Sequence, residues 1–344
     1  MASPDYLGRM DPVALTRELV EIPSSTGDEG RIGDFLDRKL SNLGYGVTRQ
    51  EVAPGRWNVY AWRDPPVVVL STHMDTVPPV LPIREDDANL YGRGTCDAKG
   101  LMAAQIAAAE DLAARGERRV ALLFLVGEEY GSDGARAAAH LQPKGRFLIN
   151  GEPTGNLLAL GHKGALYARL TARGRAAHSA YPEEGDSAIE AILAALNRIR
   201  QVPLPEDDVL GPSTVNIGTI QGGVRPNVIP DACRAELLVR TVSDTTELKR
   251  ALTAAAGSGV QVEFAWELAH ARFRAIPGFA TTVVRFTTDV PYLTAWGEPF
   301  LLGPGSIDVA HTDREHVRKQ DIREGSTLYQ RLVTTLLNSD GPNS

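Results

Sequence analysis

VVVLSTHMD, residues 67–75, joins a short apolar run to a histidine and an aspartate. Further apolar runs occupy residues 120–126, 147–149 and 300–302, and an alanine-rich helix is predicted at about 99–115, between the first two runs. Nearly continuous apolar runs are typical of strands buried on both faces of a sheet. The alternation of strands and helices therefore predicts an α/β fold whose central sheet is mostly parallel and flanked by helices.

Further helices are predicted at both ends of the chain. Apolar residues at helical spacing in residues 12–43 predict two helices, or one helix broken at Pro23, with Gly44 as a stop signal. A final helix is predicted at about residues 326–337. These helices would cover the central sheet.

A different pattern occupies residues 165–271. The predicted order is a strand at 165–172, a helix at 187–200, strands at 214–220 and 232–242, a helix at 246–256 and a strand at 260–266. This βαββαβ order is that of the ferredoxin-like unit, which is a complete small domain. Because a strand-like run and a helix follow it, we expect this domain to be inserted into a larger one, made of residues 1–164 and 272–344.

The composition excludes several classes of partner. Lys and Arg total 36 against 43 Asp and Glu, a net charge of −7 that is dispersed along the chain and disfavours nucleic acid. The longest apolar run is far shorter than the ~20 residues of a membrane span, and the N-terminus lacks a signal-peptide core. Two cysteines, Cys96 and Cys233, cannot form a multi-disulfide scaffold. We expect a soluble cytoplasmic protein without a membrane or nucleic-acid partner.

Residues that can bind a metal follow each apolar run, in the order His73 and Asp75, Glu128 and Glu129, Glu152, and, after a Gly-Pro-Gly turn, His311. The carboxyl ends of the strands in an open α/β sheet form its ligand-binding edge, so we expect these side chains to converge. Asp97 joins them from a glycine-rich loop, residues 92–100, just before a predicted helix.

The donor types indicate the kind of metal. Two imidazoles and three carboxylates without a thiolate cage favour zinc, cobalt or manganese in a catalytic setting. Five ligands exceed the needs of one tetrahedral ion, whereas two ions that share a carboxylate would use them all. An acidified water and a free carboxylate that takes its proton together predict hydrolysis. Asp75 is placed to accept the other N–H of His73, and the spacing leaves open whether Glu128 or Glu129 is the free carboxylate.

Other chemistries fit less well. The loop at residues 92–100 lacks the spacing of a phosphate-binding loop, and no dinucleotide fingerprint follows the first strand. Cys96 directly precedes Asp97 and is better explained as a small buried turn residue than as a ligand or a nucleophile. No Gly-x-Ser-x-Gly elbow supports a serine hydrolase.

These motifs resemble the di-zinc family that contains acetylornithine deacetylase, succinyl-diaminopimelate desuccinylase, aminoacylase and carboxypeptidase G. The matching segments are residues 71–78, 92–100, 127–129, 151–154 and 303–311. The resemblance implies that His73 and Glu152 bind one zinc, that Glu129 and His311 bind the other, and that Asp97 bridges the two. It also implies that Glu128 is the general base and that Asp75 supports His73.

The resemblance assigns roles to the inserted domain as well. It implies that this domain is a lid that forms a homodimer, and that His178, in residues 174–182, stabilises the oxyanion in the partner's active site. Residues that match positions of the substrate pocket are Asn216, Gly223, Asn227 and Arg240. Arg240 can pair with a substrate carboxylate, or it can be an ordinary surface charge.

We therefore expect a metal-dependent hydrolase that cleaves the amide bond of a small N-acyl amino acid, with a deacetylase acting on acetylornithine or a desuccinylase as the nearest parallels. One alternative is a dipeptidase or carboxypeptidase of the same mechanism, which would take a dipeptide. Another is a hydrolase that frees lysine or ornithine from an amino-group carrier protein. A non-catalytic metal-binding or peptide-binding homologue is the alternative from a different class.

Overall fold

The computed structural model describes residues 10–339, which fold into two compact units. Unit 1 comprises the described residues up to Leu160, together with Phe273–Thr282 and the chain from Thr288 onward. Unit 2 comprises Gly161–Arg272 and Val283–Thr287. The last segment was predicted to belong to the larger domain, but it pairs with unit 2, where Lys163 N donates to the carbonyl oxygen of Val284 at 3.3 Å.

Unit 1 is built on a six-stranded sheet in the order β1-β2-β6-β3-β7-β17. Its strands are β1 (Gly46–Ala53), β2 (Arg56–Trp62), β6 (Val120–Leu125), β3 (Val68–His73), β7 (Phe147–Asn150) and β17 (Glu298–Leu301). The four strands from β6 to β17 are parallel to one another, whereas β1 and β2 pair antiparallel. Every residue of β3, β6 and β7 is buried, as their continuous apolar runs predict.

Helices flank this sheet, as predicted. They are α1 (Pro12–Val20), α2 (Gly30–Asn42), α3 (Lys99–Ala114), α4 (Asp133–Ala138) and α7 (Lys319–Asn338). The small side chains of α3 allow it to pack between α1 and α7, so it is buried on nearly all sides. The helix α7 begins at Lys319, earlier than the predicted start near Ser326. Its first turns are rich in charged residues, which hid the helix in the sequence, although Ile322 in these turns packs into the core.

Short elements complete unit 1. A three-stranded sheet in the order β18-β5-β4 consists of His316–Arg318, Asn89–Tyr91 and Arg84–Glu85. Single 3-10 turns occur at η2 (Glu128–Tyr130), η4 (Val290–Tyr292) and η5 (Thr294–Trp296). None of the helices within residues 10–339 combines the length and the apolar character of a membrane-spanning segment.

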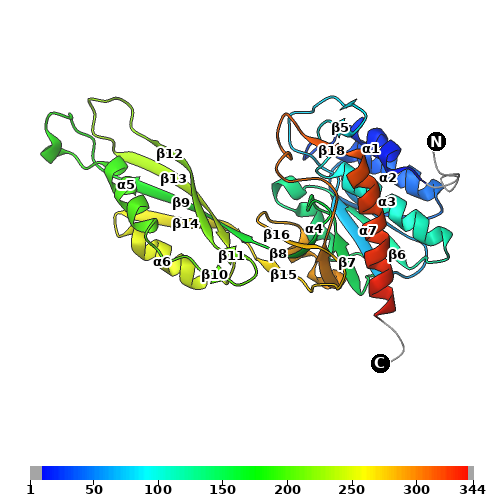
Figure 1. The fold of residues 1–344 in the computed structure, drawn as a ribbon. Coiled ribbons are helices and arrows are strands. Elements are labelled where there is room, and N and C mark those ends of the chain that lie inside the picture. The colour runs from blue at the N-terminus through cyan, green and yellow to red at the C-terminus, as the bar shows by residue number, and fades with distance from the viewer. Residues whose placement is uncertain (1–9, 340–344) are drawn as a thin grey trace. The chain divides into compact units, whose positions relative to one another are not determined.

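Unit 2 contains a four-stranded antiparallel sheet in the order β12-β13-β9-β14 (Figure 1). Its elements are β9 (Gly164–Arg173), α5 (Ala188–Ile199), β12 (Thr214–Gly222), β13 (Ala232–Thr241), α6 (Thr246–Ala256) and β14 (Val260–Leu268). The apolar sides of α5 and α6 pack on one face of the sheet. The element order and the strand order are those of the ferredoxin-like arrangement that the sequence predicts.

Minor strands accompany the two units. A two-stranded ribbon pairs β10 (Glu206–Asp207) with β11 (Gly211–Pro212), and η3 (Pro182–Glu184) is a 3-10 turn. A small sheet in the order β15-β8-β16 is formed by Ala271–Arg272, Leu158–His162 and Thr281–Val284, where the chain passes between the units.

Candidate metal centre

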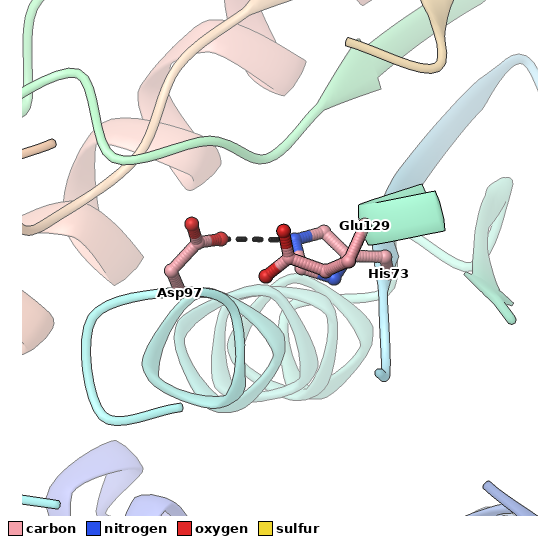
Figure 2. A group of neighbouring side chains, drawn as sticks. All are labelled: His73, Asp97 and Glu129. Carbon is pink, nitrogen blue, oxygen red and sulfur yellow. Dashed lines mark hydrogen bonds and ion pairs between the residues drawn. The ribbon is translucent and has the colours of Figure 1, made fainter. Parts of the chain in front are cut away.

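His73 is the last residue of β3 and is almost completely buried. Its Nε2 lies 2.9 Å from Oδ1 of Asp97, as the dashed line in Figure 2 shows. Its Nδ1 lies 3.0 Å from the carbonyl oxygen of Asp75 and 3.4 Å from Oδ1 of the same residue. Because Nδ1 is held by Asp75, Nε2 is the atom directed at the neighbouring carboxylates, which is the arrangement of a metal-binding imidazole.

Asp97 lies at the end of the glycine-rich loop, immediately before α3. Its Oδ1 contacts His73, and its Oδ2 lies 3.3 Å from Nε2 of His311. Burial would raise the pKa of Asp97, but hydrogen bonds from His311 and His73 outweigh it and hold the pKa well below its usual value. One ionised carboxylate between two imidazoles is the geometry that a bridging ligand requires.

Glu129 and His311 complete this group. Glu129 belongs to the η2 turn that follows β6, and Nε2 of His311 lies 3.0 Å from its carboxylate. Hydrogen bonds to Asp97 and Glu129 raise the pKa of His311 to about 10. Carboxylates that favour a protonated imidazole this strongly would favour a divalent cation for the same electrostatic reason.

Glu128 and Glu152 add further acidic groups close by. Glu152 is buried, and Nδ2 of Asn150 donates to it at 3.3 Å. Burial raises the pKa of both carboxyl groups well above the ordinary value, and repulsion from Glu152 adds to the effect on Glu128. This excess of negative charge is costly without a compensating cation.

The donor set fits a metal. Figure 2 shows His73, Asp97 and Glu129 facing one another from β3, from the start of α3 and from η2. Each offers one ligand atom, and these atoms lie within 4.8 Å of one another. His311 contacts Asp97 and Glu129. Glu152 interacts with all three members of the group through its charge.

The carboxylate of Asp75 does more than the sequence predicts. It was expected to accept the N–H of His73, but the backbone carbonyl is the closer acceptor. The carboxylate itself accepts from the hydroxyl of Thr26 at 2.8 Å and from the backbone amides of Glu128 and Glu129 at 3.1 and 3.2 Å. Asp75 therefore holds the turn that carries both glutamates, in addition to contacting His73.

Sequence reasoning missed Asp289, a fully buried aspartate in the same unit. Burial raises its pKa to about 7, while a hydrogen bond from Ser132 opposes the shift. Its Oδ1 has no hydrogen-bond partner among residues 10–339. Asp289 raises the pKa of Glu128 and Glu152 by charge repulsion. No local signal marks this residue, because it follows no apolar run and lies in an irregular segment.

The remaining predicted residues lie in unit 2. His178 is exposed, and its Nδ1 accepts from the amide of Ala180 at 3.1 Å. The structure brings its segment beside that of Asn227, whose carbonyl oxygen accepts from Ser179 N at 3.1 Å. Gly223 has a positive φ of 74°, which suits glycine.

Asn216 and Arg240 share a face of the sheet in unit 2. Thr214 pairs with Arg240 and Asn216 pairs with Leu238, so both predicted residues lie on the face opposite to α5 and α6. Burial lowers the pKa of Arg240, and no described residue forms an ion pair with it. A half-buried cation of this kind is a candidate for binding an anionic group.

Known proteins resemble this chain over most of its length. The sequence pattern of peptidase family M20/M25/M40 matches residues 69–335. A "Probable carboxypeptidase" of Aspergillus fumigatus is 38% identical, covering 97% of this chain and 88% of the relative.

Solved structures show the same fold. A tripeptidase of Staphylococcus aureus superposes with a TM-score of 0.81 at 22% identity, covering 95% of this chain and 98% of that one. A dinuclear metal-binding peptidase of Bacillus subtilis superposes with a TM-score of 0.70 at 17% identity, covering 95% and 97%.

Proposed function

The chain belongs to peptidase family M20/M25/M40 and is a metal-dependent hydrolase of amide bonds, and from this premise we propose that it is a two-metal carboxypeptidase acting on short peptides. The observation that carries the proposal is the convergence of His73, Asp97 and Glu129, with His311 in contact with two of them. The likeness to the "Probable carboxypeptidase" of Aspergillus fumigatus supports peptide substrates in place of the N-acyl amino acids that the sequence motifs led us to expect first.

We assign the ligands as follows. His73 and Glu152 would hold one divalent ion, Glu129 and His311 would hold the other, and Asp97 would bridge them. The position of Asp97 between the two histidines supports this division. Mixed nitrogen and oxygen donors suit zinc, cobalt or manganese.

We propose Glu128 as the general base. Bound divalent ions would supply Lewis acidity, which polarises the scissile carbonyl and acidifies a water molecule. Glu128 would take the proton of that water and deliver it to the leaving nitrogen of the peptide bond. Its place on the η2 turn, beside the proposed ligand Glu129 and with its amide held by the carboxylate of Asp75, supports this role.

Unit 2 would supply substrate recognition. Arg240 would pair with the terminal carboxylate of the peptide, which is the group that a carboxypeptidase must recognise. Asn216 lies on the same sheet face and would bind polar groups beside it, while Gly223 and Asn227 would shape the same pocket. We also propose that His178 stabilises the oxyanion in the partner's active site of a homodimer, as the family resemblance implies.

A substrate panel tests this function. Protein reconstituted with zinc or cobalt is given short peptides with free and amidated carboxyl termini, together with N-acetylornithine, and the released amino acids are quantified. We expect release of the last residue from peptides with a free carboxylate and none from the amides. Turnover of N-acetylornithine alone would establish the deacylase alternative, and a metal-loaded chain without any turnover would indicate a non-catalytic binder.

A further inference from the structure

Glu315 is a fully buried carboxylate that the proposed mechanism does not use. Its Oε1 accepts hydrogen bonds from the backbone amides of Gly94 at 2.8 Å, Cys96 at 3.2 Å and Asp97 at 3.3 Å. Its Oε2 accepts from the guanidinium of Arg93. One carboxylate therefore gathers four donors from the loop that ends in Asp97.

The same residue also holds the start of this loop. The carbonyl oxygen of Glu315 accepts from the amide of Gly92 at 3.1 Å, so both its backbone and its side chain contact the loop. The loop has few other internal bonds, among them Thr95 Oγ1 to the carbonyl of Gly92 and Lys99 N to the carbonyl of Gly94. A buried carboxylate is costly unless its lone pairs are satisfied, and here the loop satisfies them. The loop conformation and the burial of Glu315 therefore depend on each other.

Glu315 connects two proposed ligands from distant parts of the sequence. It lies four residues after His311, whereas the amides that it binds precede α3 by only a few residues. Oδ2 of Asp97 and Nε2 of His311 lie 3.3 Å apart. A shift of the loop relative to the segment around Glu315 would change this separation directly.

We propose that Glu315 is a positioning residue of the metal centre, which sets the place of the bridging carboxylate of Asp97 relative to His311 through the loop amides. The inference rests on the proposed two-metal function. Its consequence is that Glu315 controls metal affinity although it is not itself a ligand. Groups that orient metal ligands typically change metal affinity by about 10–100-fold when they are replaced.

The test compares Glu315→Gln with a matched control, Glu110→Gln. Glu110 also accepts from an arginine and a second donor, Arg63 Nη2 at 2.8 Å and Tyr45 Oη at 2.9 Å, in the same unit but without contact to a proposed ligand. Zinc affinity is measured by chelator competition, and the visible spectrum of the cobalt-loaded protein reports the ligand geometry. Amide hydrogen exchange of residues 92–98 is followed in the metal-free proteins.

We expect Glu315→Gln to weaken zinc binding by about 10–100-fold, to alter the cobalt spectrum and to speed exchange in residues 92–98. Glu110→Gln should lower stability but leave all three properties unchanged. If Glu315→Gln does not fold, Glu315→Asp, which keeps the charge but withdraws it by one carbon–carbon bond, should show the same changes.

The outcomes separate the two proposals. A parent chain that binds two ions and a Glu315 variant that binds them equally tightly, with unchanged exchange, would overturn the positioning role alone. A parent chain that binds no ions would overturn the proposed function. In that case the exchange of residues 92–98 in the metal-free variants still decides whether Glu315 holds the loop.

Discussion

At the scale of single residues, Asp75 fixes the backbone of the turn that carries Glu128 and Glu129. The carboxylate of Asp75 accepts from the amides of Glu128 and Glu129, so the side chains of both glutamates start from a fixed backbone. Glu129 contacts His311, whereas among the described residues the carboxylate of Glu128 forms no hydrogen bond or ion pair with a proposed ligand. Adjacent residues in one turn therefore take different roles in our proposal, ligand and base.

Replacing Glu128 separates these roles. Glu128→Gln keeps the size of the side chain but cannot accept the proton of the water, so we expect kcat to fall by about 10²–10⁴-fold. Metal content, measured by atomic emission, should stay at the parent value. Glu129→Gln is the matched comparison, because it should lose metal as well as activity. Full activity in Glu128→Gln would remove this residue from the mechanism.

His162 predicts a pH dependence of stability. Burial lowers its pKa to about 4 from 6.5, while Nδ1–H donates to the carbonyl of Lys163 at 3.0 Å. Between pH 6.5 and pH 4, His162 is protonated in the unfolded chain but neutral in the folded chain. The folded state therefore loses stability as the pH falls from about 6.5 to 4. A pKa difference of this size lowers the free energy of unfolding by roughly 3 kcal/mol.

The variant His162→Gln cannot titrate and should lack this part of the pH dependence. Thermal unfolding of parent and variant is compared at pH 7 and pH 4.5. The parent should lose more stability than the variant on acidification, even though other groups titrate in both. An equal loss in the two proteins would contradict the buried neutral state of His162.

At the scale of elements, the start of α3 depends on a residue without a side chain. A Cβ added at Gly100 would lie 2.3 Å from the carbonyl oxygen of Thr95, which belongs to the loop that carries Asp97. Helix and loop can approach this closely only because position 100 is glycine. The contact between Gly100 and Thr95 therefore fixes the position of the loop that carries Asp97 relative to α3.

Gly100→Ala should therefore disturb both stability and metal binding. We expect a loss of about 1–3 kcal/mol, typical of overpacking, together with weaker zinc binding. Chemical denaturation and chelator competition measure the two effects. Gly259→Ala is the control, because nothing lies within 4 Å of a Cβ at that position. Parent-like zinc affinity in a destabilised Gly100→Ala would show that the loop tolerates the shift.

Element types followed from periodicity, whereas some boundaries did not. Continuous apolar runs indicate strands that are buried on both faces, as β3, β6 and β7 are. Alternating apolar and polar residues indicate a strand that is buried on one face, as β13 is. The periodicity did not predict the first turns of α7, because most of their residues are charged or polar. Ile322 in these turns is nevertheless buried. Local sequence does not show which side of such a turn meets the core.

At the scale of the whole molecule, the proposed homodimer makes a distinctive prediction. If His178 serves the partner's active site, a dimer of one Glu128→Gln chain and one His178→Ala chain contains one intact site. Mixing the two inactive variants under conditions that exchange subunits should restore roughly a quarter of the parent activity.

The readout for this mixing experiment is turnover, with light scattering to establish the mass of each species. Each variant alone should stay nearly inactive, and both should keep their metals. Restored activity would establish sites shared between subunits. A monomeric mass, or His178→Ala with parent-like turnover, would contradict the proposed role of His178.

Residue patterns alone predicted the mostly parallel sheet and the inserted βαββαβ unit and suggested which residues could bind a metal, because burial periodicity and residue chemistry are local properties. Only the tertiary structure decided the contacts among those residues and the groups that support them. Asp75 reaches the amide of Glu128 across 53 positions, and Glu315 reaches the amide of Gly94 across 221. Such contacts depend on how distant segments pack, and no spacing in the chain records that packing.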